Sequence, residues 1–532
     1  MDMRWGVLLA AALWVGCDDE AEDPPAPAGT ESAFARTHGF QFPNYGNVGV
    51  VNLTPLEMTR LFGARVCAAG EGATCTLTPN ADRWMNRTNA RMGGGHCFGM
   101  AAATLLFLEG ALDPAAFGMG DAGPAELALT ANEPLQRELA YLMALQTVPE
   151  VTRQDVGSWG TKATPREVVD HLEAGLAAGQ RFVLGFDRRT GGGHAVVVID
   201  VAEGAAPDTR HVIVYDSNFP GRETTLIVDR AANTWRYDHA ATRPDVPPDV
   251  WEGDAQTFSL SALAVSALQG LDPARTTCPT SVCEAFDPGG ARRTLTTVGD
   301  FAQVLVTDGA GRRFGDHGGE RFREIPDASA QVFRGGLWDD TAPPELSLRD
   351  DQYTVTLASP DPDTPAEVWW EGPGFALGVV DIFLGPDVED QITVAQGRAR
   401  LEYETTEAET AVVVLGAVTD VSDWEFELQS AGDDLGQVIE AELDMEQGVL
   451  FFSFDDFEAS DRSATFDLLV DRLGDDGECL LFEHRGVQVP YGAEVAIPFG
   501  EWDDGLSLVM EVDLEGDGFD ADDPVIELTD DG

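Results

Sequence analysis

The chain has 532 residues, more than one hydrophobic core usually supports, so two to four domains are expected. Acidic residues outnumber basic ones by 93 to 33, and Lys162 is the only lysine. Nucleic acids and anionic lipid surfaces recruit clustered positive charge, so neither is an expected partner. The acidity itself predicts a solvated, self-repelling surface.

The first segment has the pattern of an export signal. Residues 1–17 read MDMRWGVLLAAALWVGC, with one early arginine and an apolar run too short to cross a bilayer. The ending WVGC resembles the lipobox of bacterial lipoproteins, in which the signal peptide is cut before an acylated cysteine, although Trp14 stands where that family usually has leucine. The resemblance implies lipidation of Cys17 and a place in the cell envelope, with ordinary secretion as the alternative. The acidic, proline-rich stretch 18–35 is typical of a flexible tether. The lipid anchor is therefore the only membrane contact expected from the sequence.

Six further cysteines would meet an oxidising compartment after export. Two pairs are close enough in sequence to close small disulfide loops: Cys67 with Cys75, and Cys278 with Cys283. Neither pair has the CxxC spacing or the nearby histidine typical of zinc sites. Cys479 alternates with apolar residues in GECLLFEH, which predicts a buried strand position. Cys97 then remains as the thiol without a structural explanation.

Residues 36–272 carry helical patterns first and β-branched runs afterwards. A capping box at Thr54 starts a short helix, and the stretch 98–112 is apolar on all sides, which predicts a central buried helix. The runs RFVLGF, HAVVVIDV and HVIVYD then predict neighbouring strands. Helices followed by an antiparallel sheet are the α+β pattern.

Beyond Pro273 long helical periodicity disappears. Short alternating segments such as QYTVTLAS, TAVVVLG and GVLFFSF follow, with turns rich in Asp and Gly. This pattern predicts one or two all-β sandwich modules, over residues 273–390 and 391–532, the second of them strongly acidic.

The stretch GGGHCFGMAAATLLFLEG places Cys97 at the start of the apolar helix. A helix N-terminus lowers the pKa of a thiol and offers a backbone N–H to an oxyanion. His194, which opens a strand after TGGG, is the expected base. If that strand and the returning HVIVYDSN pair about a centre near Ala205, Asp216 lies opposite His194 and orients its ring, with Asn218 as the alternative orienter.

Three motifs in this order, GGGHCFGMA, GGGHAVVVIDV and VYDSNFPG, resemble those of bacterial papain-like cysteine peptidases, including the relatives that trim bacteriocin leaders. The resemblance covers about residues 40–265. It implies an α+β papain-like domain in which a central helix packs on an antiparallel sheet, with Cys97 as nucleophile, His194 as general base and acid, and Asp216 as orienter. That family also places a glutamine or another amide a few residues before the cysteine. Here no glutamine is present, and Asn89 is the amide proposed for the oxyanion hole.

The expectation is an envelope-anchored thiol hydrolase that acts on a peptide, amide or related acyl bond of a peptide or protein substrate, without a cofactor. An amine acceptor in place of water would make it an acyltransferase. The alternative from another class is a cell-surface binding or adhesion lipoprotein with a degenerate peptidase fold.

The acidic stretch DLEGDGFDADD, residues 513–523, begins like a calcium-binding loop. Asp513, Glu515 and Asp517 follow the opening pattern, but Pro524 stands where the bidentate glutamate belongs. An acidic tail without bound metal is the favoured interpretation, and weak calcium binding is the alternative.

Overall fold

The computed structural model describes residues 30–531 with short interruptions. The described ranges are 30–118, 123–157, 163–188, 192–241, 247–257, 259–284, 286–287, 292–299, 303–318, 320–337, 343–358, 365–385, 388–406, 410–419, 422–430, 437–456, 463–474, 478–500, 502 and 506–531. The predicted signal peptide, the lipidation site Cys17 and most of the predicted tether lie outside these residues. Within them, no helix has the length and apolar character needed to cross a membrane.

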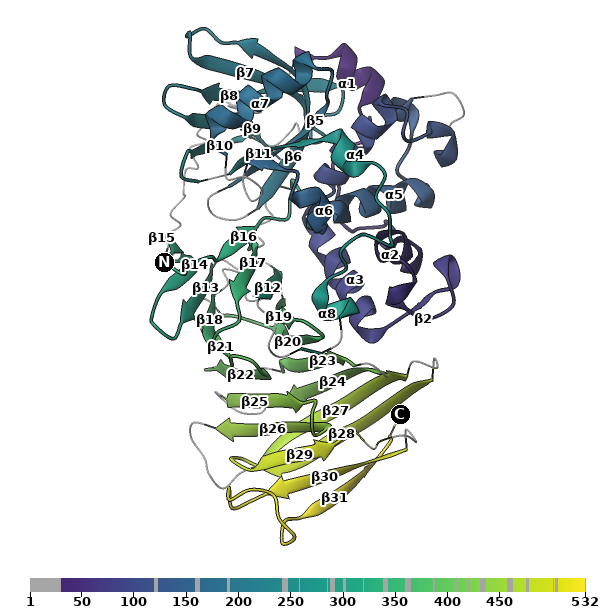
Figure 1. The fold of residues 1–532 in the computed structure, drawn as a ribbon, viewed down its shortest axis with the longest axis vertical. Helices are drawn as coiled ribbons and strands as arrows, with labels where there is room; N and C mark the ends of the chain where they lie inside the picture. Colours follow the sequence, from purple (N-terminus) through teal and green to yellow (C-terminus); the bar gives the residue numbers. More distant parts are fainter. Residues whose placement is uncertain are drawn as a thin grey trace, which may run out of the picture.

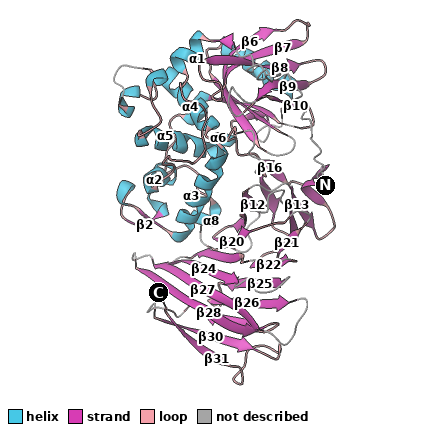
Figure 2. Cartoon of the chain, turned by 180° about the vertical axis from the view of Figure 1, so that it is seen from behind, coloured by secondary structure: helices cyan, strands magenta, loops and turns pink. Residues whose placement is uncertain are grey.

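Antiparallel sheet is the main component of the fold, with 44% of the residues in strands and 22% in helices. Helices lie beside a sheet at one end of the molecule, and two long sheets fill the other end (Figures 1 and 2). The helices are α1 (Ala33–His38), α2 (Pro55–Phe62), α3 (Pro79–Arg91), α4 (Cys97–Leu108), α5 (Glu133–Ala144), α6 (Pro149–Thr152), α7 (Pro165–Ala177) and α8 (Thr280–Cys283).

Helix α4 is the centre of the helical layer, as its sequence predicts. Every residue from Cys97 to Phe107 is buried, because α4 packs between α5 and the sheet that follows. A helix that is apolar all round tolerates only such a position. Its N-terminus therefore points into the protein rather than into solvent.

The sheet beside these helices has the order β10-β9-β8-β7-β6-β5-β11-β4, with β1 paired to β8. Its strands are β1 (Thr30–Glu31), β4 (Val156–Gly157), β5 (Phe182–Asp187), β6 (Gly193–Glu203), β7 (Thr209–Tyr215), β8 (Arg222–Asp229), β9 (Thr234–Ala240), β10 (Asp249–Asp254) and β11 (Leu260–Ala264). A separate two-stranded ribbon joins β2 (Cys67–Ala69) to β3 (Thr76–Leu77).

Strands β6 and β7 form the hairpin that the sequence predicts, but the predicted register is wrong. Val197 pairs with Tyr215 and Ala202 with His211, and the register shifts at a bulge between Val198 and Asp200. A bulge adds an unpaired residue to one strand and increases the local twist. The main cause is the turn: Glu203 already pairs with Arg210, so the hairpin is centred beyond Ala205, and Asp216 follows the end of β7 instead of lying directly opposite His194.

The remaining strands form two large antiparallel sheets. One has the order β16-β17-β12-β19-β20-β23-β24-β27-β28, and the other β15-β14-β13-β18-β21-β22-β25-β26-β29-β30-β31. The strands are β12 (Arg292–Val298), β13 (Gln303–Asp308), β14 (Arg313–His317), β15 (Glu320–Arg323), β16 (Ser329–Gln331), β17 (Glu345–Arg349), β18 (Tyr353–Ala358), β19 (Ala366–Gly372), β20 (Phe375–Ile382), β21 (Asp390–Val394), β22 (Ala399–Thr405), β23 (Val412–Val418), β24 (Ser422–Ser430), β25 (Gln437–Asp444), β26 (Val449–Asp456), β27 (Ser463–Gly474), β28 (Cys479–Pro490), β29 (Glu494–Pro498), β30 (Ser507–Asp513) and β31 (Val525–Thr529).

These two sheets share one core, which fits the predicted β-sandwich. Buried apolar residues from Leu295 to Leu528 belong to a single cluster. Both sheets continue across residue 390: β21 pairs with β18 on one side and with β22 on the other. Residues 273–390 and 391–532 therefore do not have separate cores.

Helix α3 docks the helical layer onto the nine-stranded sheet of the sandwich. Three arginines spaced four residues apart lie on one face of α3, and each pairs with a glutamate of a different strand: Arg83 with Glu425, Arg87 with Glu371 at 2.7 Å, and Arg91 with Glu345 at 3.3 Å. The side chains of these arginines are almost completely buried, so removing one partner would leave an uncompensated charge. The contact fixes the sandwich against the first region of the chain.

The cysteines follow the predicted pairing with one correction. Cys67 bonds to Cys75 and Cys278 to Cys283, which confirms both disulfide loops. Cys97 is a buried free thiol, whereas Cys479 is exposed, so the prediction of a buried Cys479 is wrong. The reason is its position: it is the first residue of β28, and β28 lies at the edge of its sheet.

Candidate active site

The thiol of Cys97 lies at the N-terminus of α4 and is completely buried. Its Sγ accepts a hydrogen bond from the backbone N–H of Ala195 at 3.2 Å. The same sulfur lies 3.1 Å from the carbonyl oxygen of Arg334, to which the thiol donates. The sulfur is therefore held between a backbone donor on β6 and the backbone acceptor of Arg334.

His194 connects Cys97 to Asp216. The Nε2 atom of His194 lies 2.8 Å from Oδ1 of Asp216, and both side chains are completely buried. The opposite ring nitrogen, Nδ1, is on the side of Cys97, because a Cβ atom built on Gly336 would contact both Nδ1 and Cβ of Cys97. The starts of α4 and β6 and the residue that follows β7 thus bring together the three residues singled out from the sequence.

Asp216 is held by two further donors. Its Oδ1 also accepts the backbone N–H of Asn218 at 2.8 Å, and its Oδ2 accepts the phenol of Tyr237 on β9 at 2.6 Å. Burial and the nearby Asp216 carboxylate raise the pKa of Tyr237 well above its ordinary value, so the phenol stays protonated and donates. The side chain of Asn218 is directed elsewhere, donating to the carbonyl oxygens of Ala241 and Gly336.

The charge on His194 follows from these neighbours. Burial by itself lowers the pKa of the imidazole, but the carboxylate of Asp216 and the thiolate of Cys97 raise it further than burial lowers it, from 6.5 to about 10. The ring is therefore protonated near neutral pH. The charged ring lies next to Cys97 at the N-terminus of α4.

One carbonyl oxygen beside Cys97 receives two hydrogen bonds. The oxygen of Gly335 accepts the backbone N–H of Cys97 at 3.1 Å and Nδ2 of Asn44 at 2.9 Å. The Asn44 amide is oriented by its own oxygen, which accepts the backbone N–H groups of His96 at 2.7 Å and Tyr45 at 3.0 Å. Two preorganised donors on one carbonyl oxygen are the geometry of an oxyanion hole.

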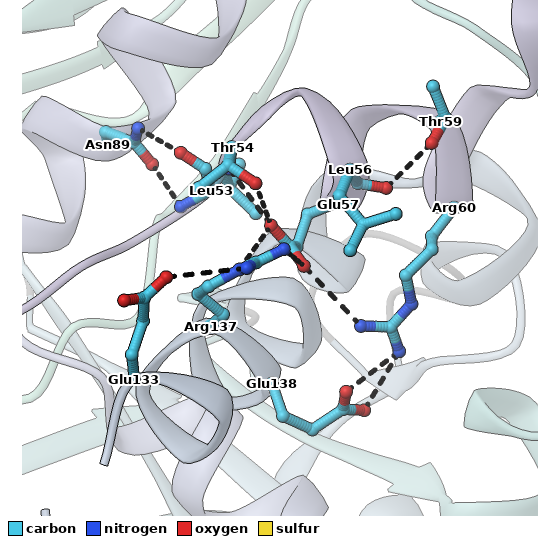
Figure 3. A network of polar contacts seen from close by, with 10 residues as sticks. All are labelled: Leu53, Thr54, Leu56, Glu57, Thr59, Arg60, Asn89, Glu133, Arg137 and Glu138. Carbon is cyan, nitrogen blue, oxygen red and sulfur yellow. Dashed lines mark hydrogen bonds and ion pairs between the residues drawn. The ribbon is translucent and has the colours of Figure 1, made fainter. Parts of the chain in front are cut away.

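Asn89, the amide proposed from the sequence, lies elsewhere. Its side chain accepts the N–H of Leu53 at 2.9 Å and donates to the carbonyl of the same residue at 3.0 Å, next to the capping box of α2 (Figure 3). That capping box includes Glu57, which also pairs with Arg137 of α5. The structure therefore places Asn44, and not Asn89, beside the backbone of Cys97.

His96 precedes Cys97, but its ring is bonded to other residues. Its ring nitrogens lie 2.8 Å from the carbonyl oxygen of Tyr45 and 3.0 Å from Oδ1 of Asn52, and its ring stacks on Tyr45. Burial lowers the pKa of His96 to about 4, so the ring is neutral near pH 7. His96 thus anchors the loop that carries Asn44.

Residues 332–337, here named the covering segment, connect β16 toward β17. They lie against Cys97 and His194. The segment is bound by backbone hydrogen bonds: Gly336 N–H donates to Gly193 at 3.0 Å, and Leu337 N–H to Gly94 at 3.0 Å. Arg334 N–H donates to Oε1 of Gln146 at 2.8 Å. The covering segment explains why Cys97 and His194 are completely buried.

Sequence reasoning missed Asn44, Tyr237 and the covering segment. Asn44 lies far before Cys97 in the chain, and Tyr237 alternates with neighbours like any strand residue. The adjacent glycines in FRGGLW are a local signal, but nothing local shows which part of the protein they approach.

The acidic C-terminal loop brings together three carboxylates, those of Asp513, Glu515 and Asp523, within 4.8 Å of one another. Asp517, proposed from the sequence, is not among them. Both oxygens of Asp513 already accept backbone N–H groups of its own turn, and these bonds hold the pKa of Asp513 below its ordinary value. Backbone hydrogen bonds thus hold the turn that carries Asp513.

Comparisons with protein-family models, with curated proteins and with solved structures found no match to this chain. A functional assignment accordingly rests on the site itself.

Proposed function

We propose that this protein is a thiol hydrolase that cleaves a peptide, amide or related acyl bond. The observation that carries the proposal is the buried series Cys97, His194 and Asp216, in which the imidazole is charged and oriented by a carboxylate. Helices followed by an antiparallel sheet, with the cysteine at the head of the central helix, support the papain-like relationship that the sequence motifs imply.

The proposed reaction begins with the thiolate of Cys97. It attacks the carbonyl carbon of the substrate, and the charge that develops on the carbonyl oxygen is stabilised by the backbone N–H of Cys97 and by Asn44. The His194 imidazolium then protonates the leaving amine. Water, deprotonated by His194, cleaves the resulting thioester and restores the thiol.

Asp216 and Tyr237 support this cycle without contacting the substrate. The carboxylate keeps the imidazole in one orientation and stabilises its positive charge, and the phenol of Tyr237 holds the carboxylate from the other side. They are positioning residues for the His194 ring.

We also propose that the protein is exported and anchored to a membrane of the cell envelope through Cys17. The export-signal pattern and the lipobox-like ending support this. Replacing Cys17 by Ser should move the protein from the membrane fraction to the soluble fraction. Unchanged membrane association of Cys17→Ser would contradict the anchor.

The catalytic proposal is tested by thiol alkylation with iodoacetamide near neutral pH, read by peptide mass spectrometry. Because the covering segment hides Cys97, the measurement uses Arg334→Glu, in which the new carboxylate would face Asp155 and Asp187 and be repelled. Cys97 should react much faster than Cys479 in the same molecule. If Cys97 reacts no faster than Cys479, a binding protein without turnover becomes the better description.

A further inference from the structure

We propose that the protein cleaves its own chain between Gly335 and Gly336, in a reaction that rests on the thiol hydrolase function proposed above. The covering segment is then the first substrate of the site. Cleavage divides the chain into one fragment that ends at Gly335 and one that begins at Gly336.

The carbonyl oxygen of Gly335 already occupies the proposed oxyanion hole. It accepts hydrogen bonds from the backbone N–H of Cys97 and from Asn44, the two donors of the oxyanion hole. Among the described residues, no other carbonyl oxygen accepts hydrogen bonds from both of these groups. The sulfur of Cys97 lies 3.1 Å from the carbonyl oxygen of the preceding residue, Arg334, so attack requires it to turn from that oxygen to the neighbouring carbonyl carbon of Gly335.

The two glycines allow this close approach. A side chain at Gly335 would collide with the carbonyl oxygen of Gly94, and one at Gly336 would collide with His194 and Cys97. Gly336 also has a φ of +82°, a conformation that other residues rarely adopt. The backbone of the covering segment therefore fits the site only as a glycine pair.

Arg334 provides a recognition contact next to the glycines. Its guanidinium lies 3.0 Å from Asp187 and 3.6 Å from Asp155, and all three side chains are nearly buried. The protein as a whole is strongly acidic. Two buried carboxylates hold the Arg334 guanidinium by opposite charge and by the geometry of the ion pairs, and this fixes the covering segment in place. The substrate class is thus a peptide with arginine one residue before the cleaved glycine pair.

The chemical step uses only groups of this chain and one water molecule. Sγ of Cys97 forms a bond to the carbonyl carbon of Gly335, the bond from that carbon to the nitrogen of Gly336 breaks, and His194 gives its proton to that nitrogen. A water molecule then attacks the thioester and loses a proton to His194. The products are a carboxylate at Gly335, an amine at Gly336 and the free thiol of Cys97.

The two fragments would remain associated after cleavage. Strands β12 and β13 precede the cut, and they pair with β17, β18 and β19, which follow it. The shared hydrophobic core of the sandwich likewise contains residues from both sides. Self-cleavage would change the covalent chain while leaving the folded body intact, and it would free the covering segment from the site.

The test follows the full-length chain after synthesis in a cell-free system, by denaturing electrophoresis, N-terminal sequencing and native size-exclusion chromatography. The wild type should divide into two fragments under denaturing conditions, with Gly336 as the new N-terminus, and elute as one species under native conditions. Cys97→Ala should stay intact and elute at the same volume. Cleavage that persists in Cys97→Ala, or that starts at another residue, would overturn the proposal.

A second pair of variants separates this inference from the proposed function. Gly336→Val and Arg334→Glu should displace the covering segment and therefore block self-cleavage, while exposing Cys97 to iodoacetamide. If the wild type stays intact but Cys97 in these variants reacts rapidly, self-cleavage is overturned and the hydrolase proposal stands. If Cys97 in these variants reacts no faster than Cys479, both proposals fail.

Mixing wild-type and Cys97→Ala chains tests whether the reaction occurs within one molecule. Because the covering segment is buried in its own site, the Cys97→Ala chain should stay intact in the mixture, and the rate for the wild type should not depend on protein concentration. Cleavage of the Cys97→Ala chain by the wild type would overturn the intramolecular reaction.

Discussion

The surroundings of Cys97 and Cys479, the two free cysteines of the described chain, differ in burial and in charge. Cys97 is completely buried, beside an imidazolium and a helix N-terminus. Cys479 is exposed at a sheet edge, but its nearest partner is the carboxylate of Asp471, and burial together with that negative charge raises the pKa of Cys479. The contrast teaches that solvent access and electrostatic surroundings are separate properties: the exposed thiol has a negative neighbour, whereas the buried thiol has a positive one.

The largest expected effect comes from removing the positive neighbour of Cys97. With the covering segment displaced by Arg334→Glu, His194→Ala should lower the alkylation rate of Cys97 by about 10²- to 10⁴-fold, because no imidazolium then stabilises the thiolate. Alkylation of Cys479 in the same sample is the internal control and should not change. If the alkylation rates of Cys97 and Cys479 fell by a similar factor, the proposed effect of His194 on Cys97 would be contradicted.

The next effect concerns the amide beside Cys97. Asn44→Ala should slow self-cleavage by about 10²- to 10³-fold, since one of the two donors to the Gly335 carbonyl is lost. Asn89→Ala is the matched control: it removes hydrogen bonds to Leu53 and should lower the free energy of unfolding by about 1–2 kcal/mol without slowing cleavage comparably. The reverse pattern would assign the oxyanion role to Asn89.

A smaller effect is expected from the phenol behind Asp216. Tyr237→Phe removes one hydrogen bond to the carboxylate and should slow self-cleavage about tenfold, because the His194 ring is less firmly held. Tyr215→Phe provides a comparison, since its buried hydroxyl donates to the carbonyl of Phe40 instead. Equal rate losses in the two variants would indicate a general loss of packing.

The smallest expected effect is the pH dependence of Cys97 itself. Because the pKa of His194 is raised to about 10, the imidazolium persists between pH 6.5 and pH 8.5. The proposed mechanism requires Cys97 to be a thiolate over that range, so with the covering segment displaced its alkylation should change by less than about threefold. Alkylation of Cys479 should rise about tenfold per pH unit, because its thiolate fraction still grows with pH there. A tenfold rise per unit at both cysteines would contradict the thiolate–imidazolium pair.

The same raised pKa has a consequence for folding stability. A histidine whose pKa is higher in the folded than in the unfolded chain contributes stability that is complete below pH 6.5 and is lost as pH rises through about 10. His96 has the opposite sign, because its pKa is lowered to about 4: its contribution is complete above pH 6.5 and is lost as pH falls through 4.

The sequence predicted features that depend on neighbours along the chain. The all-round apolar pattern after Cys97 specified a buried central helix, and close spacing specified the disulfides of Cys67 with Cys75 and of Cys278 with Cys283. Period-2 alternation specified the strands of the sandwich. Each of these signals lies within a few residues, so local physical chemistry is sufficient to predict it.

Tertiary structure alone decided what surrounds the thiol. The turn of the β6–β7 hairpin lies beyond Ala205, which changed the register that symmetry suggested, and the edge position of β28 left Cys479 exposed. Asn44 and Gly335 meet at the N-terminus of α4 although both are far from Cys97 in sequence. Contacts of this kind leave no periodicity in the sequence, because they depend on how α3 docks the sandwich against the helical layer and lays the covering segment across Cys97.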